Sequence, residues 1–594
     1  MIKSKNVKSK QNQAFFACLL FICLLISGSV KISARDGYKA SIYYSSLITH
    51  DPISITSDSA FSVFPGSGTE EDPYLIENYN ITTTSGDGVY ITGTTKHFVI
   101  RNCYINAQGS GIYIYDVADR TVLVENNTCE SSDDGIVIRY SQYALVYNNT
   151  CINITGDAIA FKYLSKHGII VNNLCIDNGV GVYSDSDNVT VINNTCKNGL
   201  YGIELDLSYD SQVINNTLIN NDNGVILRQA LNAVVTNNTF FNDGISVVAY
   251  SKSDYLSYTI QDNKVNDKNL GYFCNINSLA IDEPIYGQLL FLYCDNLTVR
   301  NQVLHNTTRG IDLTYCDDGF IINNTCVDNH YQGITIDDSD NTVIANNTCK
   351  RNGDCGLKLR GNFIDYSAIY NILEENDEYG ISIIADNSVI HHNAFIGNNP
   401  LGTSQANDDG ENNLWYEVDK LEGNYWQDYS GSGDYAIDGV GNSIDPYPLL
   451  STPIVDTIPP SISNIVHSPV YPTESDMIII NATIIDDTSV HSATLHYRIN
   501  AGSWTEVSMN LVSTDIYSAN IGPFLNSDVI DYYISAIDDS FNHNEDVNDN
   551  EGEFYSFAIT LVIAEFRPFY PSLLTIIPLN LIVVLAFRKK RRNI

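Results

Sequence analysis

Residues 148–151 read Asn-Asn-Thr-Cys, and this tetrapeptide or a close variant returns about every 22 residues along much of the chain. A segment of the form Gly-Ile-x-Ile-x precedes each copy, and its apolar residues alternate with polar ones as in a strand. This pattern predicts a right-handed parallel β-helix of roughly 13 coils, in which each strand pairs with the same strand of the next coil. Steps of 21 to 24 residues separate the second asparagines within two blocks of clear copies, which are Asn127, Asn149, Asn173, Asn194, Asn216 and Asn238, then Asn324, Asn347, Asn371 and Asn393.

Two strands are expected in each coil. A propeller of the WD type would need about twice this period, and a leucine-rich repeat would show leucine at its inward positions, so neither fits. At a fixed corner, each asparagine amide can donate to and accept from its counterparts in adjacent coils, so the repeated asparagines are structural first. The first strand of each coil is expected to begin at Gly111, Gly135, Ala158, Gly181, Gly202, Gly224, Gly244, Gly310, Gly333, Gly356 and Gly380.

Several asparagines also match the N-glycosylation pattern. Many of those inside the Asn-Asn-Thr motifs are expected to be too tightly packed for modification. The predicted acceptors lie outside the ladder and are Asn80, Asn153, Asn188, Asn306 and Asn481.

Eleven cysteines follow the N-terminal apolar run, and most of them recur at equivalent positions of the repeat. In-register strands hold neighbouring Cβ atoms about 4.8 Å apart, which is too far for a disulfide, so we predict a stacked column of small apolar side chains. A thiolate column that binds a soft metal is the alternative. Leu218 and Phe240 replace cysteine in the column, which favours packing. The main column comprises Cys129, Cys151, Cys175 and Cys196, continued by Cys326 and Cys349, and a second comprises Cys294 and Cys316.

The two ends of the chain carry predicted sorting signals. Lysines precede the apolar run Ala14 to Ile26 and small residues follow it, which is typical of a secretory signal peptide over residues 1–34. An uncleaved anchor is the alternative, although the run is short for a membrane span. Residues 568–587 are mostly apolar and precede the basic residues 588–594, which predicts one transmembrane helix with a cytoplasmic tail. Because prolines interrupt this run, a buried strand or a processed sorting tail is the alternative.

Between these ends, changes in the repeat pattern mark domain boundaries. We expect an N-terminal cap at residues 35–87, the β-helix at 88–400, and a C-terminal cap and linker with aromatic plugs at 401–455. Residues 456–562 lack the period and show short alternating strands, which predicts a β-sandwich of the immunoglobulin or fibronectin kind. The coils are interrupted from Lys264 to Leu290, where a protruding loop is expected.

The composition is strongly acidic, with 70 Asp and Glu against 32 Lys and Arg. Such a charge repels nucleic acid and favours divalent cations or cationic partners, although surface solvation alone also explains it. The acidic loop from Asp538 to Glu551 offers oxygen ligands for calcium, the one cofactor that we consider. It lacks EF-hand spacing, so a solvated loop is the alternative.

Three motifs resemble those of the NosD-type β-helix proteins of periplasmic and archaeal surfaces. They are GSGTEEDPYLI at residues 66–76, the NNT coils, and GNYWQDY with DPYPL at residues 423–449, so the resemblance covers about residues 50–450. It implies a place in a broad group of carbohydrate-binding proteins and sugar hydrolases. It also implies a copper accessory role, since the namesake is implicated in copper-site maturation of nitrous oxide reductase. No Met-rich or His-rich cluster suits copper here, because His391 and His392 are adjacent and would point to opposite faces of a strand.

The register identifies the residues that face outward on the Gly-Ile-x-Ile-x strands. The third position gives Tyr113, Val137, Ala160, Tyr183, Glu204 and Ile226. The fifth position gives Tyr115, Arg139, Lys162, Asp185, Asp206 and Arg228. Of these, Tyr113, Tyr115, Tyr183, Arg139 and Arg228 are the predicted ligand-binding residues, because tyrosine rings offer flat faces to a sugar.

A candidate catalytic patch comprises Asp185, Asp206, Glu204 and Lys162. Adjacent coils would place the two aspartates about 5 Å apart, a separation at which paired carboxylates act on a glycosidic bond. The alternative is a charge ladder in which Lys162 pairs with Asp185 and Asp206 pairs with Arg228. A weaker similarity to polygalacturonases rests on Asp-Gly pairs near Arg139 and Lys162, but the Arg-x-Lys of those enzymes is absent.

These observations favour a membrane-anchored cell-surface β-helix protein that binds polysaccharide, glycoprotein or envelope partners. A polysaccharide lyase or glycoside hydrolase that uses the carboxylate patch is the first alternative, and a copper accessory protein is the second.

Overall fold

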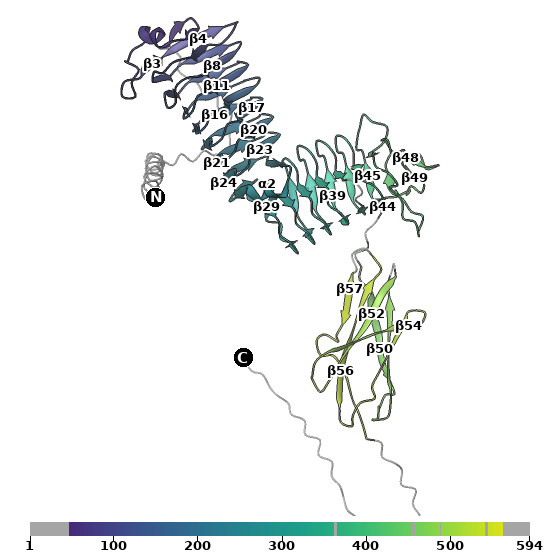
Figure 1. The fold of residues 1–594 in the computed structure, drawn as a ribbon. Helices are drawn as coiled ribbons and strands as arrows, with labels where there is room; N and C mark the ends of the chain where they lie inside the picture. The colour runs from purple at the N-terminus through teal and green to yellow at the C-terminus, as the bar shows by residue number, and fades with distance from the viewer. Residues whose placement is uncertain are drawn as a thin grey trace, which may run out of the picture. The chain divides into compact units, whose positions relative to one another are not determined.

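The computed structural model describes residues 47–361, 365–453, 456, 458–486, 489–540 and 544–561. This part of the protein is all-β, with about 14 turns of a β-solenoid and two short helices, η1 (Asp58–Val63) and α2 (Lys252–Ser257) (Figure 1). The chain divides into two compact units. The first comprises residues 1–274, 286–289 and 306–308, and the second comprises residues 275–285, 290–305 and 309–594.

Three parallel sheets form the solenoid of the first unit, so each coil contributes three strands rather than the two expected from the sequence. The sheet that carries the Gly-Ile-x-Ile-x strands is β2 (Ile53–Ile55), β5 (Val89–Thr92), β8 (Ser110–Tyr115), β11 (Asp134–Arg139), β14 (Asp157–Lys162), β17 (Val180–Ser184), β20 (Tyr201–Asp206), β23 (Asn223–Arg228) and β26 (Ile245–Val248). The second is β3 (Tyr74–Glu77), β6 (Phe98–Arg101), β9 (Val122–Glu125), β12 (Leu145–Tyr147), β15 (Ile169–Val171), β18 (Thr190–Ile192), β21 (Gln212–Ile214), β24 (Val234–Thr236) and β27 (Thr259–Gln261). The third is β1 (Ile48–His50), β4 (Tyr79–Thr83), β7 (Tyr104–Ala107), β10 (Thr128–Glu130), β13 (Thr150–Ile152), β16 (Leu174–Ile176), β19 (Thr195–Lys197), β22 (Thr217–Ile219), β25 (Thr239–Phe241) and β28 (Lys264–Val265).

The asparagine pair explains the third strand. The first asparagine adopts a left-handed backbone, with φ of +55° at Asn148, and turns the chain sharply between β12 and β13. The second asparagine is buried and forms the expected ladder: Asn149 Nδ2 donates to Asn173 Oδ1 at 3.1 Å, and Asn173 Nδ2 donates to Asn194 Oδ1 at 3.0 Å. Each amide also satisfies backbone groups, which secures a corner that has no strand of its own.

The second unit repeats this three-sheet coil. One sheet is β34 (Ile311–Thr314), β37 (Ile334–Asp337), β40 (Leu357–Arg360), β43 (Ile381–Ile384) and β46 (Ala406–Asp408). The next is β30 (Ala280–Ile281), β32 (Thr298–Arg300), β35 (Phe320–Ile322), β38 (Thr342–Ala345), β41 (Tyr366–Ile369) and β44 (Val389–His391). The last is β33 (Val303–His305), β36 (Thr325–Val327), β39 (Thr348–Lys350), β42 (Ile372–Glu374), β45 (Ala394–Ile396) and β47 (Tyr425–Trp426).

Aromatic side chains cluster after the last coils of the second unit. The ring of Trp426 stacks between those of Phe395 and Tyr435, with centroid distances of 4.1 and 4.0 Å. The indole N–H groups of the buried Trp415 and Trp426 donate to the carboxylates of Asp408 and Asp445 at 2.8 and 2.9 Å. A short antiparallel pair, β48 (Tyr435–Ala436) and β49 (Ile444–Asp445), completes this region.

The described residues between 458 and 561 form two antiparallel sheets around a common hydrophobic core. The first sheet is β50 (Ser461–Ser468), β51 (Ile478–Ile485), β55 (Ile516–Ile521) and β54 (Asn510–Ser513). The second is β53 (Thr505–Ser508), β52 (Val490–Ile499), β56 (Val529–Asp538) and β57 (Glu545–Asn548), with β58 (Tyr555–Ala558) also paired to β56.

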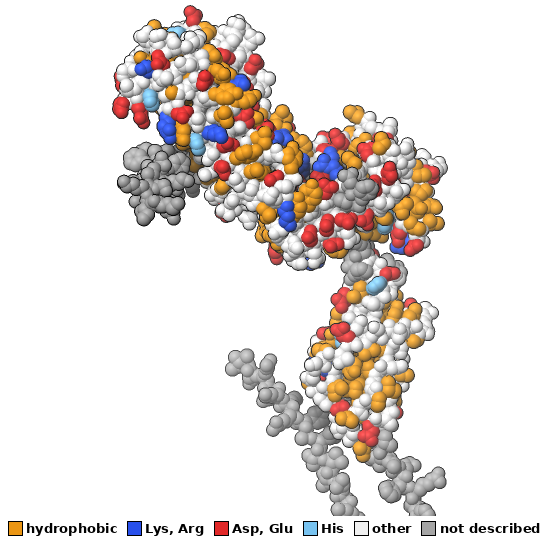
Figure 2. Space-filling model, in the orientation of Figure 1, with side chains coloured by type: hydrophobic (Ala, Val, Ile, Leu, Met, Phe, Trp, Pro, Cys, Tyr) orange, Lys and Arg blue, Asp and Glu red, His pale blue; other side chains and the backbone are white. Residues whose placement is uncertain are grey.

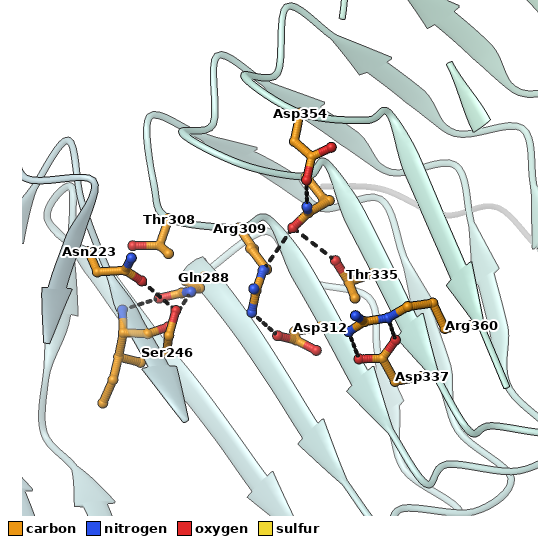
Figure 3. Close-up of polar contacts among 12 residues, drawn as sticks. Asn223, Ser246, Gln288, Thr308, Arg309, Asp312, Thr335, Asp337, Asp354 and Arg360 are labelled. Carbon is orange, nitrogen blue, oxygen red and sulfur yellow. Dashed lines mark hydrogen bonds and ion pairs between the residues drawn. The ribbon is translucent and has the colours of Figure 1, made fainter. Parts of the chain in front are cut away.

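The predicted interruption after Lys264 contains regular structure, so the expected protruding loop is wrong for part of it. Strand β29 (Lys268–Cys274) pairs antiparallel with β28. The side chain of Gln288 accepts from the N–H of Ile245 and donates to its carbonyl, both at 2.9 Å (Figure 3). This amide thus satisfies backbone groups of β26, which is the last strand of its sheet.

Candidate functional site

The two predicted outward columns lie side by side on the first unit, but four of the six residues in the third-position column, Val137, Ala160, Glu204 and Ile226, are buried rather than exposed. Tyr113 pairs with Val137, and Tyr183 pairs with Glu204. In the fifth-position column, Arg139 lies between Tyr115 and Lys162, whereas Asp185 follows the end of β17. All the candidate binding and catalytic residues of this unit are therefore on one sheet and its edge.

The charged residues of the patch form ion pairs, but with partners different from the predicted ones. Lys162 Nζ lies 2.6 Å from Asp157 Oδ2, and Arg228 Nε lies 2.8 Å from Glu204 Oε1. The expected Lys162–Asp185 and Asp206–Arg228 pairs are wrong, because a nearer carboxylate takes each cation. Among the described residues, no cation lies within ion-pair distance of Asp185 or Asp206.

Burial governs the protonation of this patch. It raises the pKa of Asp185, although the Tyr163 backbone N–H donates a 2.6 Å hydrogen bond to that carboxylate and Lys162 lies near. It also raises the pKa of Asp157 against the opposing effect of Lys162. The pKa of Tyr183 rises through burial and through the neighbouring charges of Asp185 and Asp206. The patch thus contains carboxyls that protonate more readily than exposed ones.

An exposed tyrosine column lies on this surface, and sequence reasoning predicted its first member, Tyr115, as a binding residue but missed Tyr140 and Tyr163. We define this column as Tyr115, Tyr140 and Tyr163. The rings of Tyr140 and Tyr163 stack at 5.7 Å with side chains 39% and 46% exposed, and Tyr115 meets Tyr140 edge-on at 5.7 Å. The guanidinium of Arg139 lies over the Tyr163 ring at 4.1 Å. Tyr140 and Tyr163 directly follow the fifth position in two adjacent coils, which was the available sequence signal.

The second unit carries a polar network on its corresponding strands that sequence reasoning did not find (Figure 3). Arg309 donates to Gln332 Oε1 at 2.8 Å and pairs with Asp312 at 3.1 Å. Gln332 in turn donates to Asp354. Nearby, Arg360 pairs with both carboxylate oxygens of Asp337 at 2.6 and 2.5 Å. The charged groups of this network pair with one another. The network therefore accounts for these polar residues as structural contacts and does not require a ligand.

The two adjacent histidines do not point to opposite faces, which corrects the expectation from strand geometry. His391 ends β44, but His392 lies at the next corner with a left-handed φ of +54°. The two Nδ1 atoms approach to 2.7 Å, and Glu417 Oε2 lies within 4.0 Å of both. These three side chains thus form a possible metal-ligand group.

The glycosylation predictions are placed but not tested by the structure. Asn153 and Asn188 are exposed at corners, whereas Asn80 and Asn481 are half-buried within β4 and β51, and Asn306 is half-buried. The first asparagines of the Asn-Asn-Thr motifs, expected to be packed, are instead exposed or half-exposed at corners, because only the second asparagine enters the ladder.

The predicted calcium loop begins at the buried Asp538. Its Oδ1 accepts from the backbone N–H groups of Ser540 and Asn544 at 3.1 and 2.9 Å. The carboxylates of Asp456 and Asp486 lie nearby and could hold a cation together with Asp538.

The cysteines follow the predicted packing arrangement. Cys129, Cys151, Cys175 and Cys196 pair in register across successive coils, and Leu218 and Phe240 continue the column. The eleven cysteines of the described residues form no disulfide, and ten of them are buried. In this column the pKa of Cys151 is raised by its hydrogen bond with Cys129 and by burial. Neutral thiols of this kind pack as small apolar groups and are poor metal ligands.

Comparisons with known proteins identify the type of β-helix. Residues 165–281 and 269–431 match the family model described as "Periplasmic copper-binding protein (NosD)", and residues 59–195 match "Right handed beta helix region". A search of curated proteins gives no match.

Three solved structures are among the similar ones. The periplasmic alginate epimerase AlgG is 11% identical over 61% of this chain and 73% of its own, with a TM-score of 0.19. A tailspike protein mutant of E. coli bacteriophage HK620 in complex with pentasaccharide is 11% identical over 82% and 84%, with a TM-score of 0.26. The A-module of the Azotobacter vinelandii mannuronan C-5 epimerase AlgE6 is 14% identical over 58% and 87%, with a TM-score of 0.20.

No helix in the described part of the chain is long and apolar enough to cross a membrane. The predicted signal peptide at residues 1–34, the transmembrane helix at 568–587 and the basic tail at 588–594 lie outside the described residues.

Proposed function

Because the β-helix of this chain is of the NosD type, we propose that the protein binds polysaccharide, or the glycan part of a glycoprotein, at the cell exterior. The tyrosine column of the first unit is the observation that carries this proposal. The apolar residues 568–587 would tether the protein to the membrane, with the basic residues 588–594 in the cytoplasm. The sandwich of residues 458–561, which we assign to the immunoglobulin or fibronectin kind, would then serve as a spacer.

Exposed stacked rings suit a sugar ligand. A sugar ring has one face of C–H groups, which packs against the electron-rich face of a tyrosine. Successive rings one coil apart repeat this contact along the solenoid, so the surface fits an extended polymer better than a single sugar. Because Tyr140 and Tyr163 are already held against each other and against Arg139, little side-chain entropy is lost on binding.

Polar groups around the column would orient the ligand. Figure 2 shows Lys and Arg side chains lying among hydrophobic ones, a class that includes tyrosine, on the coils of this unit. Arg139 lies against the column, and the half-buried pair of Lys162 and Asp157 lies one coil further along. Hydroxyl groups of a sugar can donate to Asp157 and accept from Arg139.

The test compares polysaccharide binding by the full-length chain and by two matched variants. A glycan array selects the ligand, and affinity electrophoresis measures its dissociation constant. The double substitution Tyr140→Ala with Tyr163→Ala should weaken binding about 100-fold, or roughly 1.4 kcal/mol for each ring. The control is Tyr293→Ala with Tyr315→Ala, a stacked pair of the second unit at 4.8 Å, which should bind normally. Equal binding by both variants would refute the proposed surface.

Catalysis on the bound glycan is the second candidate function, favoured by the raised pKa of Asp185 beside Asp206. Release of reducing ends, or of unsaturated products, from the glycan that binds would support it. Asp206→Asn should then abolish turnover but leave binding intact. If turnover is unchanged in that variant, Asp206 is not catalytic. If no bound glycan is turned over, the protein binds glycans without catalysis.

A further inference from the structure

The side chains of His391, His392 and Glu417 converge within the second unit, far in sequence from the tyrosine column. Their ligand atoms, the two Nδ1 atoms and Glu417 Oε2, all lie within 4.8 Å of one another. The side chains are 15%, 8% and 25% exposed, so the group is shielded from bulk water but not sealed. Two imidazoles and one carboxylate are a typical donor set for Cu²⁺ or Zn²⁺.

The two Nδ1 atoms are at hydrogen-bond distance, whereas the separations of Glu417 Oε2 from both nitrogens fit ligands around one ion better than hydrogen-bonded partners. Ligand atoms about 2.1 Å from a shared ion lie roughly 3.0–3.4 Å apart. Glu417 Oε2 lies 3.7 Å from His392 Nδ1 and 4.0 Å from His391 Nδ1, which is too long for a hydrogen bond and within a small side-chain adjustment of ligation. Lys420 contacts the other oxygen, Oε1, at 3.5 Å, so Oε2 points to the nitrogens.

A second layer of contacts fixes the orientation of His392. Its Nε2 lies 2.9 Å from Glu422 Oε2, a geometry in which Nε2–H donates to the carboxylate and Nδ1 carries the lone pair. Tyr370, at the corresponding corner one coil earlier, stacks on the His392 ring at 4.9 Å. A carboxylate behind a histidine is a common arrangement around bound transition metals.

The local backbone explains how adjacent residues can act together. The left-handed conformation of His392 turns its side chain toward that of His391, at a corner where the equivalent residues of earlier coils are Asn346 and Asn323. The segment that carries Glu417 and Glu422 folds back on itself, since the Glu417 N–H donates to the Glu422 carbonyl at 2.7 Å. The His392 N–H donates to the Gly423 carbonyl at 2.8 Å, which holds this segment beside the corner.

We propose that His391 Nδ1, His392 Nδ1 and Glu417 Oε2 bind one transition-metal ion of the Cu²⁺ or Zn²⁺ class, with Glu422 as a positioning residue behind His392. The ion replaces the close contact between the two Nδ1 atoms. The proton between them moves to His391 Nε2 or to solvent, which leaves both Nδ1 lone pairs on the metal. Water or a partner's side chain completes the coordination.

Metal binding by the chelator-treated full-length chain tests this site, with Cu²⁺ and Zn²⁺ titrated separately against a chromophoric chelator. We expect one ion per chain, tighter binding of Cu²⁺ than of Zn²⁺, and nitrogen hyperfine structure from two imidazoles in the Cu²⁺ EPR spectrum. His392→Asn should weaken binding at least 100-fold, and Glu422→Gln about 10- to 100-fold. Binding of Zn²⁺ alone would also support the site and would identify its ion.

The variants are chosen to keep the fold. Asparagine occupies the same left-handed corner in two earlier coils, so His392→Asn preserves the backbone, and the melting temperature of the metal-free variant checks this. Cys355→Ser is the control for a second ligand group at Asp354, Cys355 and Glu378, and it should bind metal normally. Normal binding by His392→Asn and Glu417→Gln, or a loss in Cys355→Ser alone, would overturn the proposal.

Discussion

The asparagine ladder and the tyrosine column are both stacks with one side chain per coil, and they behave in opposite ways. The ladder recurs through the solenoids of both units, is buried, and saturates its hydrogen bonds within the protein. The tyrosine column spans three coils, is exposed, and leaves ring faces open to solvent. The stack that recurs along both solenoids therefore stabilises the fold. The stack that is confined to three coils is not needed for the fold of the other coils, so it is the better candidate for a binding surface.

The largest effect is expected from breaking the ladder. Asn173→Ala removes the acceptor of the Asn149 N–H and the donor to the Val146 carbonyl, whereas Asn149 Nδ2 keeps two backbone acceptors. The hydrogen bonds from Asn149 Nδ2 to Asn173 and from Asn173 Nδ2 to Asn194 are lost as well. At 1–3 kcal/mol for each of the two orphaned groups and about 1 kcal/mol for each of the other lost bonds, the free energy of unfolding should fall by about 5 kcal/mol. Urea denaturation followed by circular dichroism measures the change.

The neighbouring Asn172 provides the matched control. It occupies the left-handed corner with φ of +57° and lies outside the ladder. Asn172→Gly suits that backbone and should change the stability little. Equal losses in Asn173→Ala and Asn172→Gly would show that the corner turn, and not the amide ladder, stabilises the coil.

Asp243 provides a pH-dependent test of the same ladder chemistry. Its Oδ2 accepts from Asn221 N and Nδ2 at 3.2 and 2.7 Å, while its buried Oδ1 has no hydrogen-bond partner among the described residues. Burial raises the pKa of Asp243 to about 8. Since this folded-state value lies above the unfolded one, the unfolded chain loses its proton first, and stability falls as the pH rises from about 4 to 8.

Asp243→Asn restores an amide that can donate as Asn221 does to the Cys196 carbonyl. The variant should be more stable than the natural protein by up to about 4 kcal/mol at pH 7, with no difference below about pH 4. Melting curves recorded across this pH range measure the difference. A constant difference at all pH values would contradict a buried carboxylate as its cause.

The contrast between the buried ladder and the exposed surface also explains which features could be predicted from the sequence. The period, the register, the asparagine ladder and the cysteine column follow from repetition, and all are confirmed. The third strand was missed because a single left-handed residue such as Asn148 turns the chain without a Gly or Pro signal. The ion pairs were predicted wrongly because a long side chain can reach several carboxylates. Lys162, for example, pairs with Asp157 and not with Asp185. The pairing of His391 with His392 depended on a backbone angle that no periodic pattern predicts.

The smallest stability effect is expected in the tyrosine column. The Tyr163 side chain is 46% exposed and contacts only Tyr140 and Arg139 among the aromatic and cation–π pairs of this surface, so Tyr163→Ala should change the free energy of unfolding by about 0.5 kcal/mol or less. Urea denaturation of this variant beside Asn173→Ala measures both stacks on one scale. A loss of several kcal/mol in Tyr163→Ala would show that the tyrosine column stabilises the fold. Its rings would then be structural and would not form a binding surface. A small loss of stability together with weakened glycan binding would show that the tyrosine column binds the ligand, whereas the buried asparagine ladder stabilises the fold.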